Sequence, residues 1–525
     1  MSDQQVAERS AKIGGHAPVT RRVFSNYAFQ LINQFLRLSA QLILVPLFLA
    51  AWGPEVYKDW IVLFSVASFL GACNFGSGTY FANRFIELIA RHDREGFRRE
   101  LHAALFCSLT LGIVILALAY AIIAACEAAG VLHASAMTAR TVWACLILMT
   151  FPVGYSFSQE ILRSIYLAEG ELARGECVFS IYLSLLTGFV ALVLALKMPP
   201  IVTAVCYFVL PLFLAIGIIV DVKWRYSGIV LRLRVPTAIE LRRIVPNSLM
   251  FFAAPLSTAA IQNGPIILFG ILGVPAVPIL SYSLIRVISG LARQSAFQFA
   301  NGSGIEMARQ QRRGDAHACA HLYFVTGRIV TGMIGLLSGF VVLAAAPFLG
   351  FWTHGTVPSD QPLLLTFLVG LFVAAPGQAA LMFLNFMNLP KAIAAAWSGQ
   401  AILGIALSAI FVPIFGVGAA AISFAAIEAL TVGICLPIIV QRRFGLSAVR
   451  QAVSSVSVGL AAFLWSFAVA KLAFGMELGG IKGLAAAAAI WAAFAVPPFG
   501  LLVLPQTSRR MVISRITRYA RGLVC

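Results

Sequence analysis

The sequence has little charge for its length. Only 11% of its 525 residues are Asp, Glu, Lys or Arg, whereas 60% are hydrophobic and the mean hydropathy is +0.91. Soluble domains average about 25% charged and 45–50% apolar residues. This composition excludes a soluble globular fold.

The usual signatures of catalysis and of covalent cross-linking are also missing. The nine cysteines are scattered and form no CxxC pair, so a disulfide framework is not expected. There is no Walker loop, GxSxG elbow or HExxH pair. His317, Cys319 and His321 are close in sequence, but a zinc site needs further ligands. We expect no metal, no cofactor, no ATP hydrolysis and no enzymatic activity.

Long apolar runs take the place of these features. A membrane-spanning helix needs about 20 mainly apolar residues, and such runs recur along the whole chain. The sequence predicts an all-α membrane protein of about fourteen spans. They are 23–51, 60–83, 101–125, 142–168, 177–196, 201–221, 245–272, 277–300, 322–351, 363–389, 392–413, 419–440, 453–474 and 483–504.

The spans suggest two six-helix lobes. The first lobe covers 23–222 and the second covers 245–441, with a basic linker at 223–244 between them and two further spans at 442–504. Short matching motifs recur at an offset of 219 to 221 residues; for example, Gln159 matches Gln378. Six spans separate the copies, so the pattern predicts a parallel repeat.

The basic residues predict the orientation. Of the 38 Lys and Arg residues, 28 fall in segments on the side of the N-terminus and five on the opposite side. Because cytoplasmic loops retain positive charge, the segments 1–22 and 505–525 are both expected in the cytoplasm, with the chain in a bacterial inner membrane. This asymmetry explains the net charge of +18 without a nucleic-acid partner. The basic tail is either a helix on anionic headgroups or disordered.

Polar residues follow one face of the first span. Asn26, Gln30, Asn33, Arg37 and Gln41 are spaced by 4, 3, 4 and 4 residues, which aligns them on a helix. Ionisable groups at bilayer depth usually face a watery cavity or a partner. We interpret the stripe as a cavity lining; the alternative is a helix interface joined by amide hydrogen bonds.

The eighth span repeats this pattern with Tyr282, Arg286, Ser289 and Arg293. Its two arginines lie about 10 Å apart on one face and repel each other unless an anionic ligand or acidic partners compensate them. No acidic residue lies on this span. The guanidinium fork suits phosphate oxygens, so a diphosphate ligand fits; for Arg293 the alternative is snorkelling to the interface.

Three further charged residues within the predicted spans are functional candidates. Glu160 and Arg163 are three residues apart in the fourth span, which predicts a neutralised pair that either locks helices together or contacts substrate. Glu428 in the twelfth span has no local partner. It either pairs with an arginine of another helix or remains protonated, and Glu160 and Glu428 are the candidates for ion coupling.

Several segments resemble motifs of the polysaccharide transporter, or O-antigen flippase (Wzx-like), family. The sequence after the first span is similar to the family's LGPExYGxW turn, and another segment resembles its DxGxGT stretch. Lys58-Asp59 and Asn74 depart from those patterns. The matching segments are 52–57 with Trp60, 74–79, 282–286 and 415–421.

This resemblance implies membership of the multidrug, oligosaccharidyl-lipid and polysaccharide exporter superfamily. It implies two lobes in a V shape, alternating access, and an undecaprenyl-pyrophosphate-linked oligosaccharide carried from the cytoplasmic to the periplasmic leaflet for O-antigen or exopolysaccharide synthesis. Other expected partners are membrane lipids and a polysaccharide polymerase or export machinery. The expected cavity residues are Arg37, Arg286, Arg293, Asn33, Gln41 and Arg163.

Three alternatives remain open from the sequence. A multidrug or cation antiporter of the same superfamily needs buried carboxylates in its first lobe, but the first span has none. A lipid II flippase would share the same carrier lipid. A membrane glycan polymerase would need a large periplasmic loop, and the predicted outer loops are short.

Overall fold

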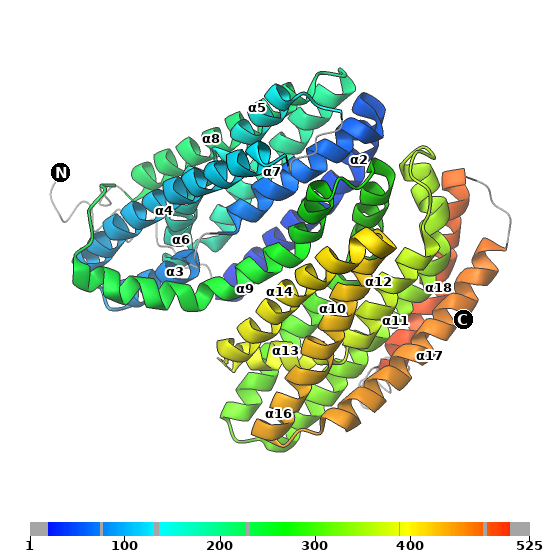
Figure 1. Ribbon diagram of the computed structural model, residues 1–525. Helices are drawn as coiled ribbons and strands as arrows, with labels where there is room; N and C mark the ends of the chain where they lie inside the picture. The colour runs from blue at the N-terminus through cyan, green and yellow to red at the C-terminus, as the bar shows by residue number, and fades with distance from the viewer. Residues whose placement is uncertain are drawn as a thin grey trace, which may run out of the picture. The chain divides into compact units, whose positions relative to one another are not determined.

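The computed structural model describes residues 19–73, 77–130, 136–226, 231–387, 389–475 and 480–503. Over these ranges the regular secondary structure is entirely helical (Figure 1). The apolar composition predicted this all-α architecture, which is confirmed. The predicted N-terminal segment and basic tail lie largely outside the described residues.

The chain divides into two compact units, with the main boundary inside α9 at Phe252 and Ala253. The earlier helices are α2 (Val19–Gly71), α3 (Ser77–Ala90), α4 (Arg94–Ala128), α5 (Ala139–Thr150), α6 (Val153–Ala168), α7 (Leu172–Ala195) and α8 (Pro200–Arg225). The later elements are α9 (Ala238–Ile271), α10 (Ala276–Arg312), α11 (Ala316–Trp352), α12 (Gln361–Ala374), α13 (Gly377–Phe386), α14 (Pro390–Phe415), α15 (Val417–Glu428), the π-helix η1 (Ala429–Cys435), α16 (Leu436–Phe444), α17 (Ala448–Phe474) and α18 (Gly480–Val503).

The number of spans agrees with the prediction of about fourteen. Among the described residues, twelve helices are long and apolar enough to cross a membrane, and the bent pair α12 and α13 makes a thirteenth. In addition, α2 joins two helices across a kink at Gly53, so it contains the predicted span 23–51 and the first half of the predicted span 60–83. The chain is therefore a multi-pass membrane protein.

Two glycines with a positive φ angle lie in segments that resemble motifs of the polysaccharide transporter family, at 52–57 and 415–421. Gly53 has φ +71° and Gly416 has φ +74°, a region that side chains with a Cβ avoid. Gly53 kinks α2, and Gly416 separates α14 from α15. The residue after the first kink, Pro54, starts a helix that contains the Lys58–Asp59 ion pair at 3.5 Å. Lys58 was one of the five basic residues that we counted in loops on the side opposite the N-terminus. It is instead a buried residue of a helix.

Each unit contains one span that is interrupted at a proline. Pro152 lies between α5 and α6, and Pro376 lies between α12 and α13, whose axes differ by 54°. Proline removes a helical hydrogen bond and clashes with the preceding turn. The two interruptions give each unit a similar irregular element, as a parallel repeat would; the repeat itself remains a prediction.

The last two spans are tightly docked in the second unit. Figure 1 shows α11, α17 and α18 side by side. A Cβ at Gly335 would approach the carbonyl oxygen of Gly459 to less than 3.0 Å, so the two backbones meet directly. Ser466 Oγ donates a hydrogen bond to Leu336 O at 2.5 Å and accepts one from Trp491 Nε1 at 2.8 Å. Small residues allow such close packing between membrane helices.

Gly335→Ala should therefore weaken the α11–α17 contact. The added methyl group has no space, and overpacking typically costs about 1–3 kcal/mol. Thermal unfolding of the purified protein measures the loss. The matched control is Gly350→Ala on the same helix, where an added Cβ meets nothing within 4 Å. Equal melting temperatures for the two variants would contradict the packing argument.

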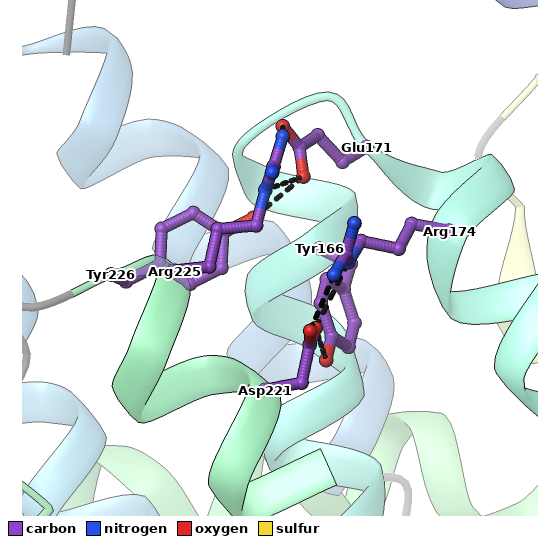
Figure 2. Close-up of polar contacts among 6 residues, drawn as sticks. All are labelled: Tyr166, Glu171, Arg174, Asp221, Arg225 and Tyr226. Carbon is purple, nitrogen blue, oxygen red and sulfur yellow. Dashed lines mark hydrogen bonds and ion pairs between the residues drawn. The ribbon is translucent and has the colours of Figure 1, made fainter. Parts of the chain in front are cut away.

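At one end of the first unit, Asp221 of α8 joins α6 and α7 (Figure 2). Its carboxylate accepts hydrogen bonds from Tyr166 Oη at 2.6 Å and Arg174 Nε at 2.9 Å, and it pairs with the Arg174 Nη2 group at 2.5 Å. Charge-assisted, bidentate bonds of this kind fix geometry strongly. The contact fixes the start of α7, and the next two turns of this helix carry Glu176 and Phe179, which are described with the candidate site below.

A second carboxylate repeats the arrangement beside the first. Glu171, in the turn between α6 and α7, accepts hydrogen bonds from Arg225 Nε at 2.7 Å and Nη2 at 2.6 Å, and from Tyr226 Oη at 3.1 Å. Figure 2 shows both groups together; we call these six residues the double clamp. Burial raises the pKa of Glu171, but the hydrogen bonds and charge of Arg225 outweigh it and leave that pKa below its ordinary value.

The lowered pKa of Glu171 predicts a pH-dependent contribution of the double clamp to stability. Because the folded-state pKa lies below the ordinary 4.5, the contribution is present above pH 4.5 and is lost as the pH falls through the lower, folded-state value. Glu171→Gln should destabilise the protein by about 1–2 kcal/mol at pH 7. Melting curves from pH 7 down to pH 3.5 test this. The difference from wild type should shrink in acid, whereas Glu95→Gln, at an exposed site, should have little effect throughout.

Candidate functional site

The polar stripe of the first span contacts α7. Asn33 Nδ2 donates a hydrogen bond to Glu176 Oε2 at 2.6 Å, and Ser180 Oγ donates one to Asn33 Oδ1 at 2.7 Å. Asn33 is only 3% exposed. Its amide joins two helices, as the helix-interface alternative describes, and its cavity role remains a prediction.

Two arginines lie against the same aromatic ring on α7. The guanidinium carbon of Arg163 is 4.8 Å from the centroid of Phe179, and that of Arg37 is 5.4 Å away. Both distances fit a cation–π interaction. Arg163 also forms an ion pair with Glu176 at 3.4 Å. The cluster of Arg37, Arg163, Glu176 and Phe179 thus combines two positive charges with one negative charge.

The ion pair of Arg163 differs from the predicted one. The expected partner, Glu160, lies elsewhere on α6: its carboxyl group packs against Gly78 of α3, where any Cβ would collide with it. Glu176 comes from the next helix and lies just outside the predicted fifth span, so no sequence pattern placed it at membrane depth. The prediction of a Glu160–Arg163 pair is wrong because the tertiary contact replaces the local one.

The remaining stripe residues are partly open to the surroundings. Arg37 and Gln41 are exposed on α2, in keeping with a cavity lining, which remains a prediction. The side chains of Asn26 and Gln30 lie outside the described residues. Among the described residues no carboxylate forms an ion pair with Arg37.

In the second unit, Arg293 of α10 pairs with Glu428 of α15. Arg293 Nη2 donates to Glu428 Oε2 at 2.8 Å, and its other terminal nitrogen bonds the second carboxylate oxygen. The Glu428 side chain is 7% exposed and that of Arg293 is 45% exposed. The acidic partner that the eighth span lacks comes from the twelfth, so Arg293 is compensated rather than available as a free cation, and Glu428 has a partner.

Arg286, two turns before Arg293, is in a different environment. It donates a hydrogen bond to the carbonyl oxygen of Gln262 on α9, and its guanidinium lies 5.8 Å from the ring centroid of the buried Tyr282. The part of the chain that the structure describes supplies no carboxylate to Arg286. Its charge is stacked and hydrogen-bonded but not neutralised.

The backbone beside Glu428 is irregular. The π-helix η1 starts at Ala429, and a Cβ at Gly377, the first residue of α13, would collide with the carbonyl oxygen of Val432. The interruption between α12 and α13 therefore packs directly on the π-helix. Short π-helical segments are frequent at functional sites. No sequence signal predicted η1.

The two units therefore carry the same charge balance at their candidate sites. Arg37 and Arg163 are offset by Glu176, and Arg286 and Arg293 are offset by Glu428. Each cluster retains one excess positive charge.

Comparison with solved structures shows that this chain shares its fold with two membrane transporters of known structure. It superposes on the lipid II flippase MurJ in an inward closed conformation with a TM-score of 0.63 and 12% identity, covering 91% of this chain and 100% of that chain. An inward-facing multidrug resistance MATE family transporter of the MOP superfamily gives a TM-score of 0.54 and 15% identity, covering 82% and 93%. No protein-family model and no curated protein matches the sequence.

The Arg293–Glu428 pair should make a measurable contribution to stability. Arg293→Gln leaves a buried carboxylate without its partner, which we expect to cost about 2 kcal/mol, less than for a fully buried pair because Arg293 is half exposed. Arg293→Gln/Glu428→Gln together should recover part of that loss. Thermal unfolding of the purified variants is the measurement.

The matched control for this cycle is Arg309→Gln on the same helix. Arg309 pairs with Glu306 at the surface, and exposed pairs of this kind contribute little. The pairing would be refuted if Arg293→Gln and Arg309→Gln melted alike. It would also be refuted if the stability lost by Arg293→Gln/Glu428→Gln equalled the sum of the losses measured for Arg293→Gln and Glu428→Gln alone.

Proposed function

We propose that this protein is a flippase for a lipid-linked glycan, carrying an undecaprenyl-pyrophosphate-linked oligosaccharide from the cytoplasmic to the periplasmic leaflet by alternating access. The likeness to the lipid II flippase MurJ and to a MATE transporter supports the transporter class. The charge chemistry of the two clusters supports the anionic lipid headgroup.

The observation that carries the proposal is the excess charge of one in each cluster. Arg37 and Arg286 have aromatic neighbours but no carboxylate partner among the described residues. A charged side chain at membrane depth costs at least about 2.5–3.5 kcal/mol. A ligand that supplies the missing anion lowers this cost.

Arginine is suited to this exchange of partners. Its planar fork stays ionised and bonds two phosphate oxygens at once. A diphosphate that leaves the headgroup layer loses water, and the guanidinium groups replace those lost hydrogen bonds. The prenyl chain remains in the bilayer while the glycan and diphosphate move.

A multidrug or cation antiporter is less consistent with these clusters. An organic cation needs an available carboxylate, but Glu176 already accepts from Asn33 and Arg163. Glu428 is held by both terminal nitrogens of Arg293. Both clusters therefore favour an anion over a cation.

A flippase for lipid II is the second candidate, favoured by the similarity to MurJ over the whole of that chain. The phenotype of a deletion separates the two. Loss of surface glycan with continued growth supports the oligosaccharide substrate, whereas lysis with accumulated peptidoglycan precursor supports lipid II. The inner-membrane location, cytoplasmic termini and a polymerase or export partner belong to the same proposal.

Replacement of Arg37 and Arg286 by Ala tests the diphosphate contact. Each loses a charge-assisted bond worth about 1.5–3 kcal/mol, so export should fall about tenfold or more for each variant, and further for the pair. Lysine at either position should retain part of the activity because the charge remains. Surface glycan is quantified in cells, with membrane levels of each variant checked by immunoblot.

Arg309→Ala serves as the control because its side chain is exposed and pairs with Glu306. Export should be unchanged in this variant. Full export by the Arg37→Ala/Arg286→Ala double variant at normal membrane levels would overturn the proposed role of these arginines.

A further inference from the structure

A group of basic residues lies near the start of α11 and belongs to neither of the two arginine clusters described above. His317, His321, Phe324 and Arg328 are spaced by 4, 3 and 4 residues, which places them on one helical face. The two histidines and Arg328 are exposed, and Phe324 is half-buried. We call this face the α11 strip.

Arg450 of α17 completes the α11 strip. Its guanidinium carbon lies 5.1 Å from the ring centroid of Phe324, so the two helices present a cation over an aromatic ring. Arg328 follows Phe324 by one helical turn. The strip therefore has two arginines on either side of an aromatic residue, contributed by two adjacent helices.

The packing of the two helices places both arginines at the same level. The amide of Gln451 lies directly against Gly327, where any added Cβ would collide with it. Arg328 and Arg450 are the chain neighbours of these two residues. Since Arg450 is in the first turn of α17, Arg328 also lies at the level where α17 begins. We take this level as that of the lipid headgroups, because a membrane span begins there.

Neither Arg328 nor Arg450 has a carboxylate partner in the part of the chain that the structure describes. Asp315, the acid that is nearest to Arg328 in the sequence, caps α11 by accepting a hydrogen bond from Ala318 N at 2.9 Å. The segment 504–525 contributes five arginines and no acidic side chain, so it offers no acidic side chain to neutralise the strip.

We propose that the α11 strip binds the headgroup of an anionic glycerophospholipid in the leaflet on the side of the predicted cytoplasmic loops. Basic residues between helices at the cytoplasmic surface attract such headgroups, and the forks of Arg328 and Arg450 suit one phosphate. Phe324 provides an apolar surface between them. The bound lipid would attach α17 to α11 at their inner ends, next to the glycine contacts that dock the last two spans.

The test uses the full-length protein in nanodiscs of phosphatidylcholine with 20% phosphatidylglycerol, and counts retained phosphatidylglycerol by native mass spectrometry after transfer to detergent. Arg328→Gln and Arg450→Gln should each reduce its occupancy, with affinity falling about fivefold per arginine. The Lys variants of both residues should retain most of the binding. Unchanged phosphatidylglycerol retention in the double Gln variant would overturn the proposal.

The control removes the same charge elsewhere. Arg98→Gln/Arg99→Gln alters two exposed arginines of α4 and should leave phosphatidylglycerol retention unchanged; an equal loss there would mean that net charge and not the strip holds the lipid. Added undecaprenyl diphosphate separates the strip from the flippase site. The Arg37→Ala/Arg286→Ala variant should keep the phosphatidylglycerol, and the strip variant should keep undecaprenyl diphosphate binding. Loss of undecaprenyl diphosphate alone in the strip variant would assign the strip to the transported lipid and refute a phospholipid site.

Discussion

The cost of holding a guanidinium group at membrane depth governs the candidate sites of both units. An arginine cannot release its proton at any ordinary pH, so its charge must be met by an acid, an aromatic face, a backbone carbonyl or a ligand. The structure uses all three protein solutions. Glu428 meets Arg293 with two hydrogen bonds, Phe179 lies beneath Arg37, and the Gln262 carbonyl accepts from Arg286. Only the first of these solutions cancels the charge.

An arginine that forms an ion pair with a carboxylate has a different role from one that contacts only a neutral ring or carbonyl group. Arg293 is fixed by its carboxylate, and its removal would leave that acid uncompensated. Arg37 is held by a quadrupole interaction worth about 0.5–2 kcal/mol, which an incoming phosphate readily exceeds. The same residue type thus serves as a structural element at one position and as a candidate ligand contact at another, and the difference depends on the neighbouring helix.

That dependence explains what the sequence could and could not predict. The number of spans, the all-α class and the positions of Arg37 and Arg286 follow from hydropathy and helical spacing, which are local properties. The partners of Arg163 and Arg293 come from residues 13 and 135 positions away, and no spacing rule reaches that far. The contact of Asn33 with Ser180 was not predictable for the same reason, since a polar side chain on a stripe has the same sequence signature whether it faces water or another helix. The π-helix after Glu428 was missed because its apolar sequence, ALTVGIC, has the same hydropathy signature as any other part of a membrane span.

The irregular backbone is confined to places where it has packing support. The interruption at Pro376 packs against η1, and this close contact is possible because Gly377 has no side chain. A similar proline, Pro152, interrupts the fourth predicted span in the first unit. In contrast, α11 and α17 are joined by close backbone contact at Gly335 and Gly459. Interrupted helices have free carbonyl and amide groups whose hydrogen bonds can be exchanged at low cost, whereas a glycine-to-glycine contact has one good arrangement. The flippase proposed for this chain would have to change conformation while its lipid-facing surface stays closed. For that proposal, the contrast favours motion at the interrupted spans over motion between α11 and α17, which the contact of Gly335 with Gly459 holds together.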